Sequence, residues 1–172
     1  PKGTPAPAAY QGDILVPFAV ESSLSGVGKM INEKGELWYQ RTFDVPSAWR
    51  GKQILLHFGA VDWKAEVWVN DVKVGEHTGG FTPFYFDITS VLNKGNNDLV
   101  VKVWDPSDRG EQPRGKQIAN PHGIWYTPVT GIWQTVWLEP VATQYITNLK
   151  TTPDIDNNSV KVEVAANTTS AD

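Results

Sequence analysis

Residues 37–45 (LWYQRTFDV) show the pattern that decides the fold class. Polar residues occupy one side of this stretch, and apolar residues recur on the other, at Leu37, Tyr39, Phe43 and Val45. A period of two is typical of a half-buried β-strand, because successive side chains of a strand point to opposite faces. Pro46, which has no backbone N–H to donate, ends the strand.

The same alternation returns along most of the chain. Further strands are expected at 52–61, 67–69, 72–76, 84–88, 99–103 and 132–138. In the first of these, Ile54, Leu56 and Phe58 share the face that we expect to point inward. Asn70-Asp71 separates two strands with residues that tolerate the left-handed backbone of a two-residue hairpin turn. No stretch of ten residues has helical spacing, so the sequence predicts an all-β sandwich or barrel.

A long irregular stretch, residues 105–130, interrupts this rhythm and is rich in glycine, proline and charge. Structureless loops longer than about 12–15 residues are uncommon in compact domains, and are usually functional or disordered. Ile124, Trp125 and Tyr126 supply apolar side chains that can anchor the second half of the stretch. We therefore interpret it as a functional loop.

Two more strands are expected beyond Pro140, at 145–152 and 159–166. Their valines form an apolar face, which a two-stranded hairpin cannot bury alone. Either they pack back on the sandwich or they open a second β-domain, and we favour the second. The expected organisation is a leader or linker over residues 1–12, a first domain over 13–142, and the beginning of a second domain over 143–172.

Composition argues against several classes of function. The 172 residues carry a net charge of −4 and no basic run, which disfavours nucleic-acid binding. No apolar stretch is long enough to span a membrane, and no cysteine is present. His57, His77 and His122 lack ligand spacing, so we expect neither a transition-metal site nor a cofactor. A calcium ion held by loop oxygens stays an open alternative.

Seven motifs follow one another in order along residues 13–140. They are VPFAVESSLSGV (16–27), LWYQRTFDVP (37–46), LHFG with VDW (56–59, 61–63), VWVNDVKVGEHTGG (67–80), FYFDIT (84–89), KVWDP (102–106) and GIWQTVWL (131–138). Together they resemble the N-terminal sugar-binding domain of glycoside hydrolase family 2, particularly its bacterial β-galactosidase-like members. The resemblance implies a jelly-roll β-sandwich similar to galactose-binding domains. An immunoglobulin-like sandwich and a (β/α)₈ barrel with two catalytic glutamates would follow it.

Under this resemblance, residues 143–172 are the first strands of the immunoglobulin-like domain, and the barrel is absent. The parent enzyme is expected to be a retaining hydrolase of β-galactosides or related glycans, whereas the chain alone is expected to be inactive. Its partners would be carbohydrate and the missing domains, with a homo-oligomer left open. A periplasmic or secreted bacterial location is expected, although the residues themselves do not determine the compartment.

The candidate sugar contacts lie in the long loop and in the VDW motif. A sugar ring needs hydrogen-bonding groups in its plane and an apolar platform against its face. The expected substrate-binding residues are Asp62, Trp63, Arg114, Lys116, Gln117, His122 and Trp125. In family members the sandwich loops reach toward the barrel pocket. Some of them also place an acidic residue ahead of the Gly-Ile strand, but the equivalent residues 123–127 contain none here.

Other interpretations stay open at this point. In a structural role, Arg114 and Lys116 would pair with the surface acids Asp105, Asp108 and Glu111, and Trp125 would pack at the rim of the core. The chain could be a free-standing carbohydrate-binding module. It could also be a subunit-contact domain that uses exposed tryptophans at 133 and 137. No two of its nineteen acids are marked as the catalytic pair that a retaining glycosidase needs.

Overall fold

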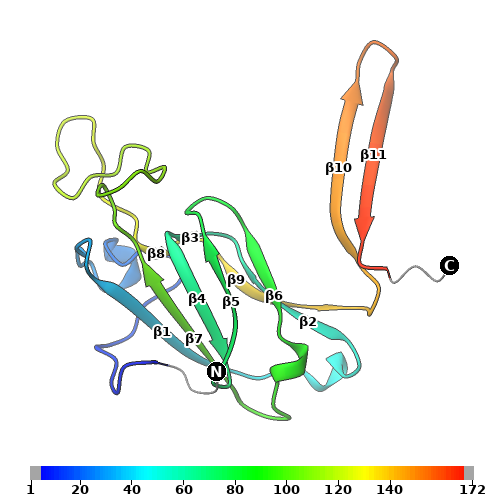
Figure 1. The fold of residues 1–172 in the computed structure, drawn as a ribbon, viewed down its shortest axis with the longest axis horizontal. Helices are drawn as coiled ribbons and strands as arrows, with labels where there is room; N and C mark the ends of the chain where they lie inside the picture. The colour runs from blue at the N-terminus through cyan, green and yellow to red at the C-terminus, as the bar shows by residue number, and fades with distance from the viewer. Residues whose placement is uncertain (1–4, 169–172) are drawn as a thin grey trace.

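The computed structural model describes residues 5–168, in which nearly all regular structure is β-strand (Figure 1). One sheet has four antiparallel strands in the order β1 (Glu36–Phe43), β7 (Asn97–Trp104), β4 (Lys64–Val69) and β5 (Val72–Thr78). The facing sheet has three, in the order β6 (Phe84–Asp87), β2 (Gln53–Phe58) and β9 (Val136–Val141). A short pair, β3 (Val61–Asp62) and β8 (Gly131–Ile132), lies at one end of the sandwich. The prediction of an all-β sandwich is confirmed.

The remaining elements are a hairpin and three single turns of 3₁₀ helix. The hairpin consists of β10 (Ile146–Asp154) and β11 (Ser159–Ala166), which pair only with each other among the described strands. The 3₁₀ turns are η1 (Ser23–Ser25), η2 (Ser47–Trp49) and η3 (Thr89–Val91).

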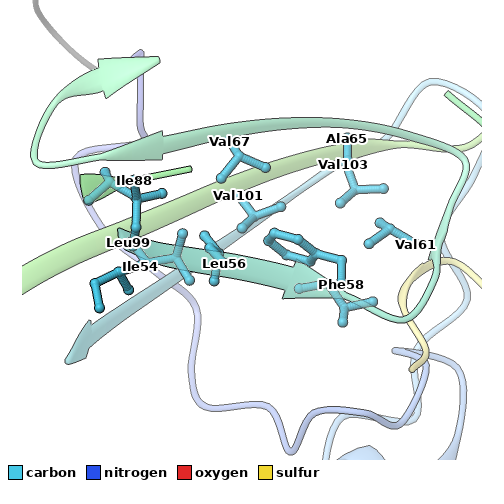
Figure 2. Packing of buried hydrophobic residues seen from close by; sticks show 12 residues of the cluster. Ile54, Leu56, Phe58, Val61, Ala65, Val67, Ile88, Leu99, Val101 and Val103 are labelled. Atoms are coloured by element: carbon cyan, nitrogen blue, oxygen red, sulfur yellow. The ribbon is translucent and has the colours of Figure 1, made fainter. Parts of the chain in front are cut away.

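The core lies between the two sheets (Figure 2). Ile54, Leu56 and Phe58 of β2 are at most 2% exposed, which confirms the face predicted for them. Opposite them are the inward side chains of the larger sheet, among them Val67, Leu99, Val101 and Val103. Each fully buried side chain of this size contributes about 1.5–3 kcal/mol to stability. This packing makes the sandwich a rigid support for its loops.

The predicted hairpin at Asn70-Asp71 is confirmed, because both residues have positive φ angles, 49° and 62°. The Asn70 side chain also links the β4–β5 turn to the beginning of β7 and to the segment before it. It donates to the backbone oxygen of Val91 (2.7 Å) and to Oδ1 of Asn97 (2.8 Å), and accepts from the backbone N–H of Asp98 (2.9 Å). The turn is therefore held by backbone shape and by a cross-linking side chain.

Asn70→Ala is expected to lower the free energy of unfolding by about 2–3 kcal/mol, because the left-handed conformation becomes strained and buried hydrogen-bonding groups lose their partner. Asn70→Gly removes the same hydrogen bonds without the strain, so it should cost about 1 kcal/mol less. Urea denaturation of both variants measures the difference. Equal midpoints for Asn70→Ala and the unmodified chain would show that the turn contributes nothing.

Two strands predicted as continuous are each broken. Residues 52–61 form β2 and β3 with a break at Gly59-Ala60, and residues 132–138 form β8 and β9 with a break at 133–135. The breaks face each other, since the Gly59 N–H donates to the oxygen of Thr135 (2.9 Å). A Cβ at Gly59 would lie 2.7 Å from Cβ of Gln134, so only glycine allows this approach. The breaks let both segments leave the three-stranded sheet and form the small β3–β8 pair.

The two tryptophans predicted to be exposed on a strand, Trp133 and Trp137, differ in their position and in their exposure. Trp133 lies in the break and is half-buried, and its indole N–H donates to the oxygen of Gly80 (2.8 Å), so the prediction of an exposed strand position is wrong. Trp137 is 43% exposed on β9, and one face of its ring stacks on His57 at 4.8 Å. The sequence pattern missed this difference because it treated 132–138 as one strand.

The β10–β11 hairpin projects away from the sandwich (Figure 1). Val160, Val162 and Val164 of β11 are all more than half exposed. The alternative in which these strands pack back on the sandwich is therefore wrong for this structure. That they begin an immunoglobulin-like domain stays a prediction, as do the domain boundaries. Of the expected leader, residues 1–4 lie outside the described part, and residues 5–12 form neither helix nor strand.

Candidate functional site

Two of the predicted site residues, Asp62 of β3 and Gln117 of the long loop, lie in contact. Asp62, on β3, is only 4% exposed, and a cis peptide bond joins it to Trp63. Its Oδ2 accepts a hydrogen bond from Nε2 of Gln117, 3.3 Å away. These two side chains are 55 residues apart in sequence. The long loop therefore reaches the end of the sandwich where β3 ends.

Two more carboxyl groups belong to the same end of the sandwich. Thr130, directly before β8, donates its backbone N–H to Oε2 of Glu21 (3.0 Å) and its hydroxyl to Oδ2 of Asp105 (3.2 Å). Asp105 is 3% exposed and also accepts from the backbone N–H of Ser107 (2.7 Å). Three acids from three distant segments are thus drawn toward one place. We call Glu21, Asp62 and Asp105 the acid cluster.

Burial raises the pKa of every member of the acid cluster. The pKa of Asp62 rises from its ordinary 3.8 to about 7, mainly through desolvation and further through the negative charges of Asp105 and Glu21, while the Gln117 hydrogen bond opposes the rise. Desolvation is also the main cause of the raised pKa values of Asp105 and Glu21. Near neutral pH the Asp62 carboxyl can therefore donate or accept a hydrogen bond, which suits contact with a hydroxyl group.

Backbone closes tightly around Asp62 on one side. A Cβ at Gly80 would lie 2.5 Å from Oδ1 of Asp62, so this position accepts only glycine without movement of the carboxyl. The Trp133 indole fixes Gly80 through the hydrogen bond to its oxygen. On the β8 side, the Tyr39 hydroxyl accepts from the backbone N–H of Ile132 (3.3 Å), and burial raises its pKa to about 12. The Asp62 carboxyl is therefore surrounded by groups that close packing and hydrogen bonds hold in place.

Two segments of the long loop pair with each other next to Asp62. Gln117 and Tyr126 form an isolated parallel β-bridge, with the Tyr126 N–H donating to the oxygen of Lys116 (2.8 Å) and the Ile118 N–H to that of Tyr126 (3.1 Å). The Gln117 side chain accepts from the backbone N–H of Val129 while donating to Asp62. Both ends of the Gln117 amide are thus in use, and its orientation is fixed.

Trp63 directly follows Asp62 and is half-buried. The other predicted site residues lie on the loop, and none of them makes a hydrogen bond or ion pair with Asp62 within residues 5–168. Arg114 donates to the backbone oxygen of Asp108, and the Lys116 ammonium lies 5.6 Å from the ring centre of Tyr126. His122 is exposed, with Nδ1 at 2.8 Å from the oxygen of Asn120. Trp125 is 37% exposed. The salt bridges considered for Arg114 and Lys116 do not form in the described part of the chain.

Sequence reasoning missed Glu21, Thr130 and Gly80 as parts of the site, and assigned Asp105 only a surface role. Asp105 is buried instead, and its carboxyl accepts hydrogen bonds from Ser107 and Thr130. Glu21 and Gly80 do fall inside two of the motifs, at 16–27 and 67–80, so the motifs were the available signal. The period-two pattern gave no signal for these residues, because they lie outside the regularly alternating strands.

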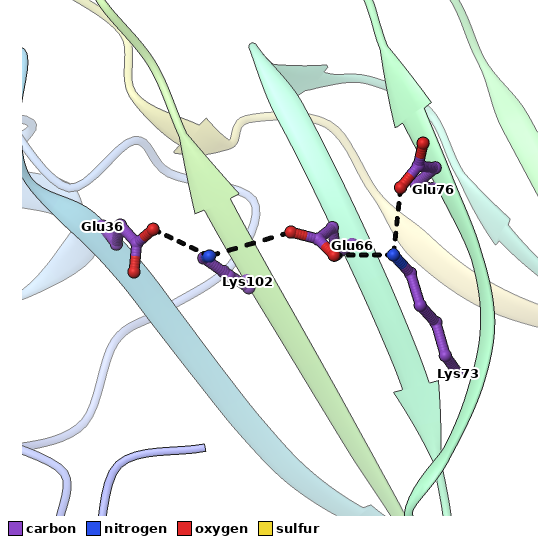
Figure 3. A network of polar contacts seen from close by, with 5 residues as sticks. All are labelled: Glu36, Glu66, Lys73, Glu76 and Lys102. Carbon is purple, nitrogen blue, oxygen red and sulfur yellow. Dashed lines mark hydrogen bonds and ion pairs between the residues drawn. The ribbon is translucent and has the colours of Figure 1, made fainter. Parts of the chain in front are cut away.

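A second polar network crosses the four-stranded sheet (Figure 3). Lys102 contacts Glu36 (2.7 Å) and Glu66 (3.7 Å), and Lys73 contacts Glu66 (2.6 Å) and Glu76 (3.0 Å). These charges satisfy one another in alternating order, as expected for a solvated sheet face. Glu66 therefore lies on a polar face of the sheet, and we assign no site here.

The described residues contain no group of three or more His, Asp or Glu side chains placed to hold a metal ion. They also contain no helix that is long and apolar enough to cross a membrane.

The described residues thus form a jelly-roll β-sandwich domain with a buried polar site at one end. The chain belongs to glycosyl hydrolases family 2, whose sugar binding domain matches residues 14–139. The resemblance drawn from the seven motifs is thereby confirmed.

Relatives include enzymes with two different names. The β-galactosidase of Thermoanaerobacter pseudethanolicus is 35% identical over 136 residues, which are 78% of this chain and 17% of that protein. The β-glucuronidase of Canis lupus familiaris is 28% identical over 181 residues, covering 92% of this chain and 28% of that protein. A solved β-glucuronidase from Ruminococcus gnavus in complex with D-glucuronic acid has a TM-score of 0.63 at 25% identity, covering 78% and 25%. The chain spans less than a third of each of these relatives.

Proposed function

We propose that this chain is the N-terminal sugar-binding domain of a retaining, β-galactosidase-like hydrolase whose catalytic barrel lies outside the chain. The observation that carries the proposal is the buried Asp62 carboxyl, held by Gln117 at the end of the sandwich from which the long loop extends. No pair of carboxyl groups in the chain is assigned to catalysis. The chain's contribution is therefore to bind and position a sugar, and bond cleavage belongs to the rest of the enzyme.

In this proposal Asp62 contacts a sugar hydroxyl, and the fixed Gln117 amide sets the orientation of its carboxyl. Trp63, adjacent to Asp62, and Trp125, exposed on the loop, offer apolar surface for the face of the ring. Arg114, Lys116 and His122 provide donors at the loop surface for the rest of the glycan. Binding energy gained at groups away from the scissile bond lowers the barrier when it is realised in the transition state.

The β10–β11 hairpin is, in this proposal, the beginning of the immunoglobulin-like domain. Its exposed apolar face supports this role, because an isolated two-stranded hairpin with such a face is marginally stable in water. The rest of that domain would cover the face.

The Asp62 contact predicts a loss of activity when the carboxyl is removed from the full-length enzyme. We expect Asp62→Ala to lower kcat/KM for p-nitrophenyl β-galactoside about 10–100-fold, since losing a buried polar contact costs about 1–3 kcal/mol. Asp44→Ala removes an exposed acid and serves as the matched control. Thermal unfolding checks that both variants stay folded.

A kcat/KM for Asp62→Ala equal to that of the control would contradict the assigned contact. The same assay on p-nitrophenyl β-glucuronide tests the choice of sugar, because relatives carry both enzyme names. Turnover by the 172-residue chain alone would contradict the wider proposal.

A further inference from the structure

A short segment connects β5 to β6 at the end of the sandwich where Asp62 lies (Figure 1). It consists of residues 79–83, with the sequence GGFTP. A Cβ at Gly80 would lie 2.5 Å from Oδ1 of Asp62, so the backbone of this segment lies directly against the Asp62 carboxyl. Consecutive Cα atoms are about 3.8 Å apart, and Phe81 therefore begins one residue away from that contact.

Hydrogen bonds hold both glycines that precede Phe81. The Gly79 N–H donates to the backbone oxygen of Trp63 (3.2 Å), and the oxygen of Gly80 accepts from the indole N–H of Trp133 (2.8 Å). One partner directly follows Asp62 in the chain, and the other lies in the break between β8 and β9. The backbone that leads into Phe81 is therefore fixed relative to the candidate site.

The Phe81 side chain is 54% exposed, although it is large and apolar. Single exposed apolar side chains are common, so exposure alone does not indicate a site. This ring, however, is also held in place, because it packs edge-on against the Trp133 ring with the ring centres 6.3 Å apart and the planes at 72°. A ring that is already ordered loses little freedom when a ligand packs on it.

The combination of Phe81 with Asp62 matches the needs of a sugar ring. A buried carboxyl offers hydrogen bonds to a hydroxyl group, and an aromatic ring beside it offers an apolar surface. One face of a galactose ring presents C–H groups, and an aromatic side chain packs well on such a face because both surfaces are apolar.

We propose that Phe81 contacts the apolar face of the galactoside whose hydroxyl group is bound by Asp62. Trp133 acts as a positioning residue, which holds Gly80 against the Asp62 carboxyl and the Phe81 ring beside it. The inference rests on the proposed function, because it adds an aromatic contact and its support to the same sugar site.

Steady-state kinetics of the full-length enzyme test the contact. Phe81→Ala is expected to raise KM for p-nitrophenyl β-galactoside about 10-fold and to leave kcat within about 2-fold, because a contact with the sugar face binds substrate and transition state alike. The inhibition constant of free galactose should rise by the same factor. Phe81→Tyr keeps the ring and should keep KM within about 2-fold of the unmodified enzyme. Tyr85→Ala, which removes a 41% exposed ring that packs on His57, is the matched control.

The positioning role of Trp133 is tested by combining substitutions. Trp133→Phe removes the hydrogen bond to Gly80 and keeps an aromatic side chain, so KM should rise about 3-fold at unchanged kcat. Added to Phe81→Ala, the same substitution should have a smaller effect than it has alone, because residues that act through one contact are not additive. Full additivity, or no effect of Trp133→Phe on KM, contradicts the positioning role.

Three results would overturn the contact with the sugar. The first is an unchanged KM for Phe81→Ala. The second is a raised KM with an unchanged inhibition constant for galactose, since the ring would then contact the nitrophenyl group. The third is a lower Tm of full-length Phe81→Ala at unchanged KM, which would assign the ring to a contact within the protein.

Asp62→Ala reports the proposed function separately. If Asp62→Ala loses activity while Phe81→Ala binds galactose normally, this inference is rejected and the proposed function stands. If neither substitution changes kcat/KM, the proposed sugar site itself is contradicted.

Discussion

Phe58→Ala is expected to lower the free energy of unfolding of this chain by about 3–5 kcal/mol, the usual cost of removing a buried phenylalanine ring. The Phe58 side chain is 0% exposed and lies on β2 between the two sheets, where it stacks on Phe84 with ring centres 4.8 Å apart. Native domains are stable by only about 5–15 kcal/mol, so the loss removes a large share of the total. Urea denaturation followed by tryptophan fluorescence measures it.

Phe81→Ala is the matched control, since the Phe81 side chain is 54% exposed and its loss should change the unfolding free energy by less than about 0.5 kcal/mol. Equal effects of the two substitutions would show that the core does not lie where the two sheets meet.

The second large effect is a fall in stability as the pH rises through the titration range of Asp62. Its pKa is about 7 in the folded chain against an ordinary 3.8, so the folded state binds a proton that the unfolded state has released. The contribution of the Asp62 carboxyl to the free energy of unfolding is therefore complete below pH 3.8, and it is lost as the pH rises from 3.8 to about 7. About three pKa units correspond to roughly 4 kcal/mol. The raised pKa values of Glu21 and Asp105 act in the same direction.

Asp62→Asn should remove most of this pH dependence, because an amide cannot ionise. The variant is expected to gain up to about 4 kcal/mol over the unmodified chain at pH 8 and almost nothing at pH 4. Urea denaturation at pH 4, 6 and 8 measures the gain, with Asp44→Asn as the control on an exposed acid. A gain that is independent of pH would mean that Asp62 does not titrate in this range.

The Phe58→Ala and Asp62→Asn variants test the hydrophobic core and the candidate site separately. Phe58 stabilises the sandwich at every pH, whereas the charged form of Asp62 weakens it near neutral pH. Under the proposed function, the cost of burying Asp62 is offset in the enzyme by its contact with the sugar. The Asp62→Asn variant would then be more stable and bind the sugar less well.

Strand positions could be predicted well because burial of one face imposes a period of two on a strand. Ile54, Leu56 and Phe58 were assigned to the core from that alternation alone, and the Asn70-Asp71 turn from residues that tolerate positive φ. The motifs added the family, which the sugar binding domain match at residues 14–139 supports. The inference from alternation depends on neighbours in sequence, and the inference from the motifs depends on the order of segments along the chain.

The breaks at Gly59-Ala60 and at 133–135 could not be predicted in the same way. They exist because two segments that are distant in sequence leave the three-stranded sheet side by side. The Gly59 N–H of one segment donates a hydrogen bond to the oxygen of Thr135 in the other. The same limit applies to the role of Trp133, whose partner Gly80 is 53 residues away. Alternation along one strand contains no information about such pairs.

For the site, the sequence by itself determined that Asp62 and the 105–130 loop carry polar and aromatic groups suited to a sugar. Only the tertiary structure decided which of them meet, because it placed Gln117 on Asp62 and left Arg114, Lys116, His122 and Trp125 without a hydrogen bond or ion pair to Asp62 within residues 5–168. It alone buried the Asp62 carboxyl and brought the charges of Asp105 and Glu21 near it, and these effects, burial first, raise the pKa of Asp62. The physical reason is that local patterning follows from each segment's own burial, whereas desolvation and charge coupling arise from packing between segments that are distant in sequence.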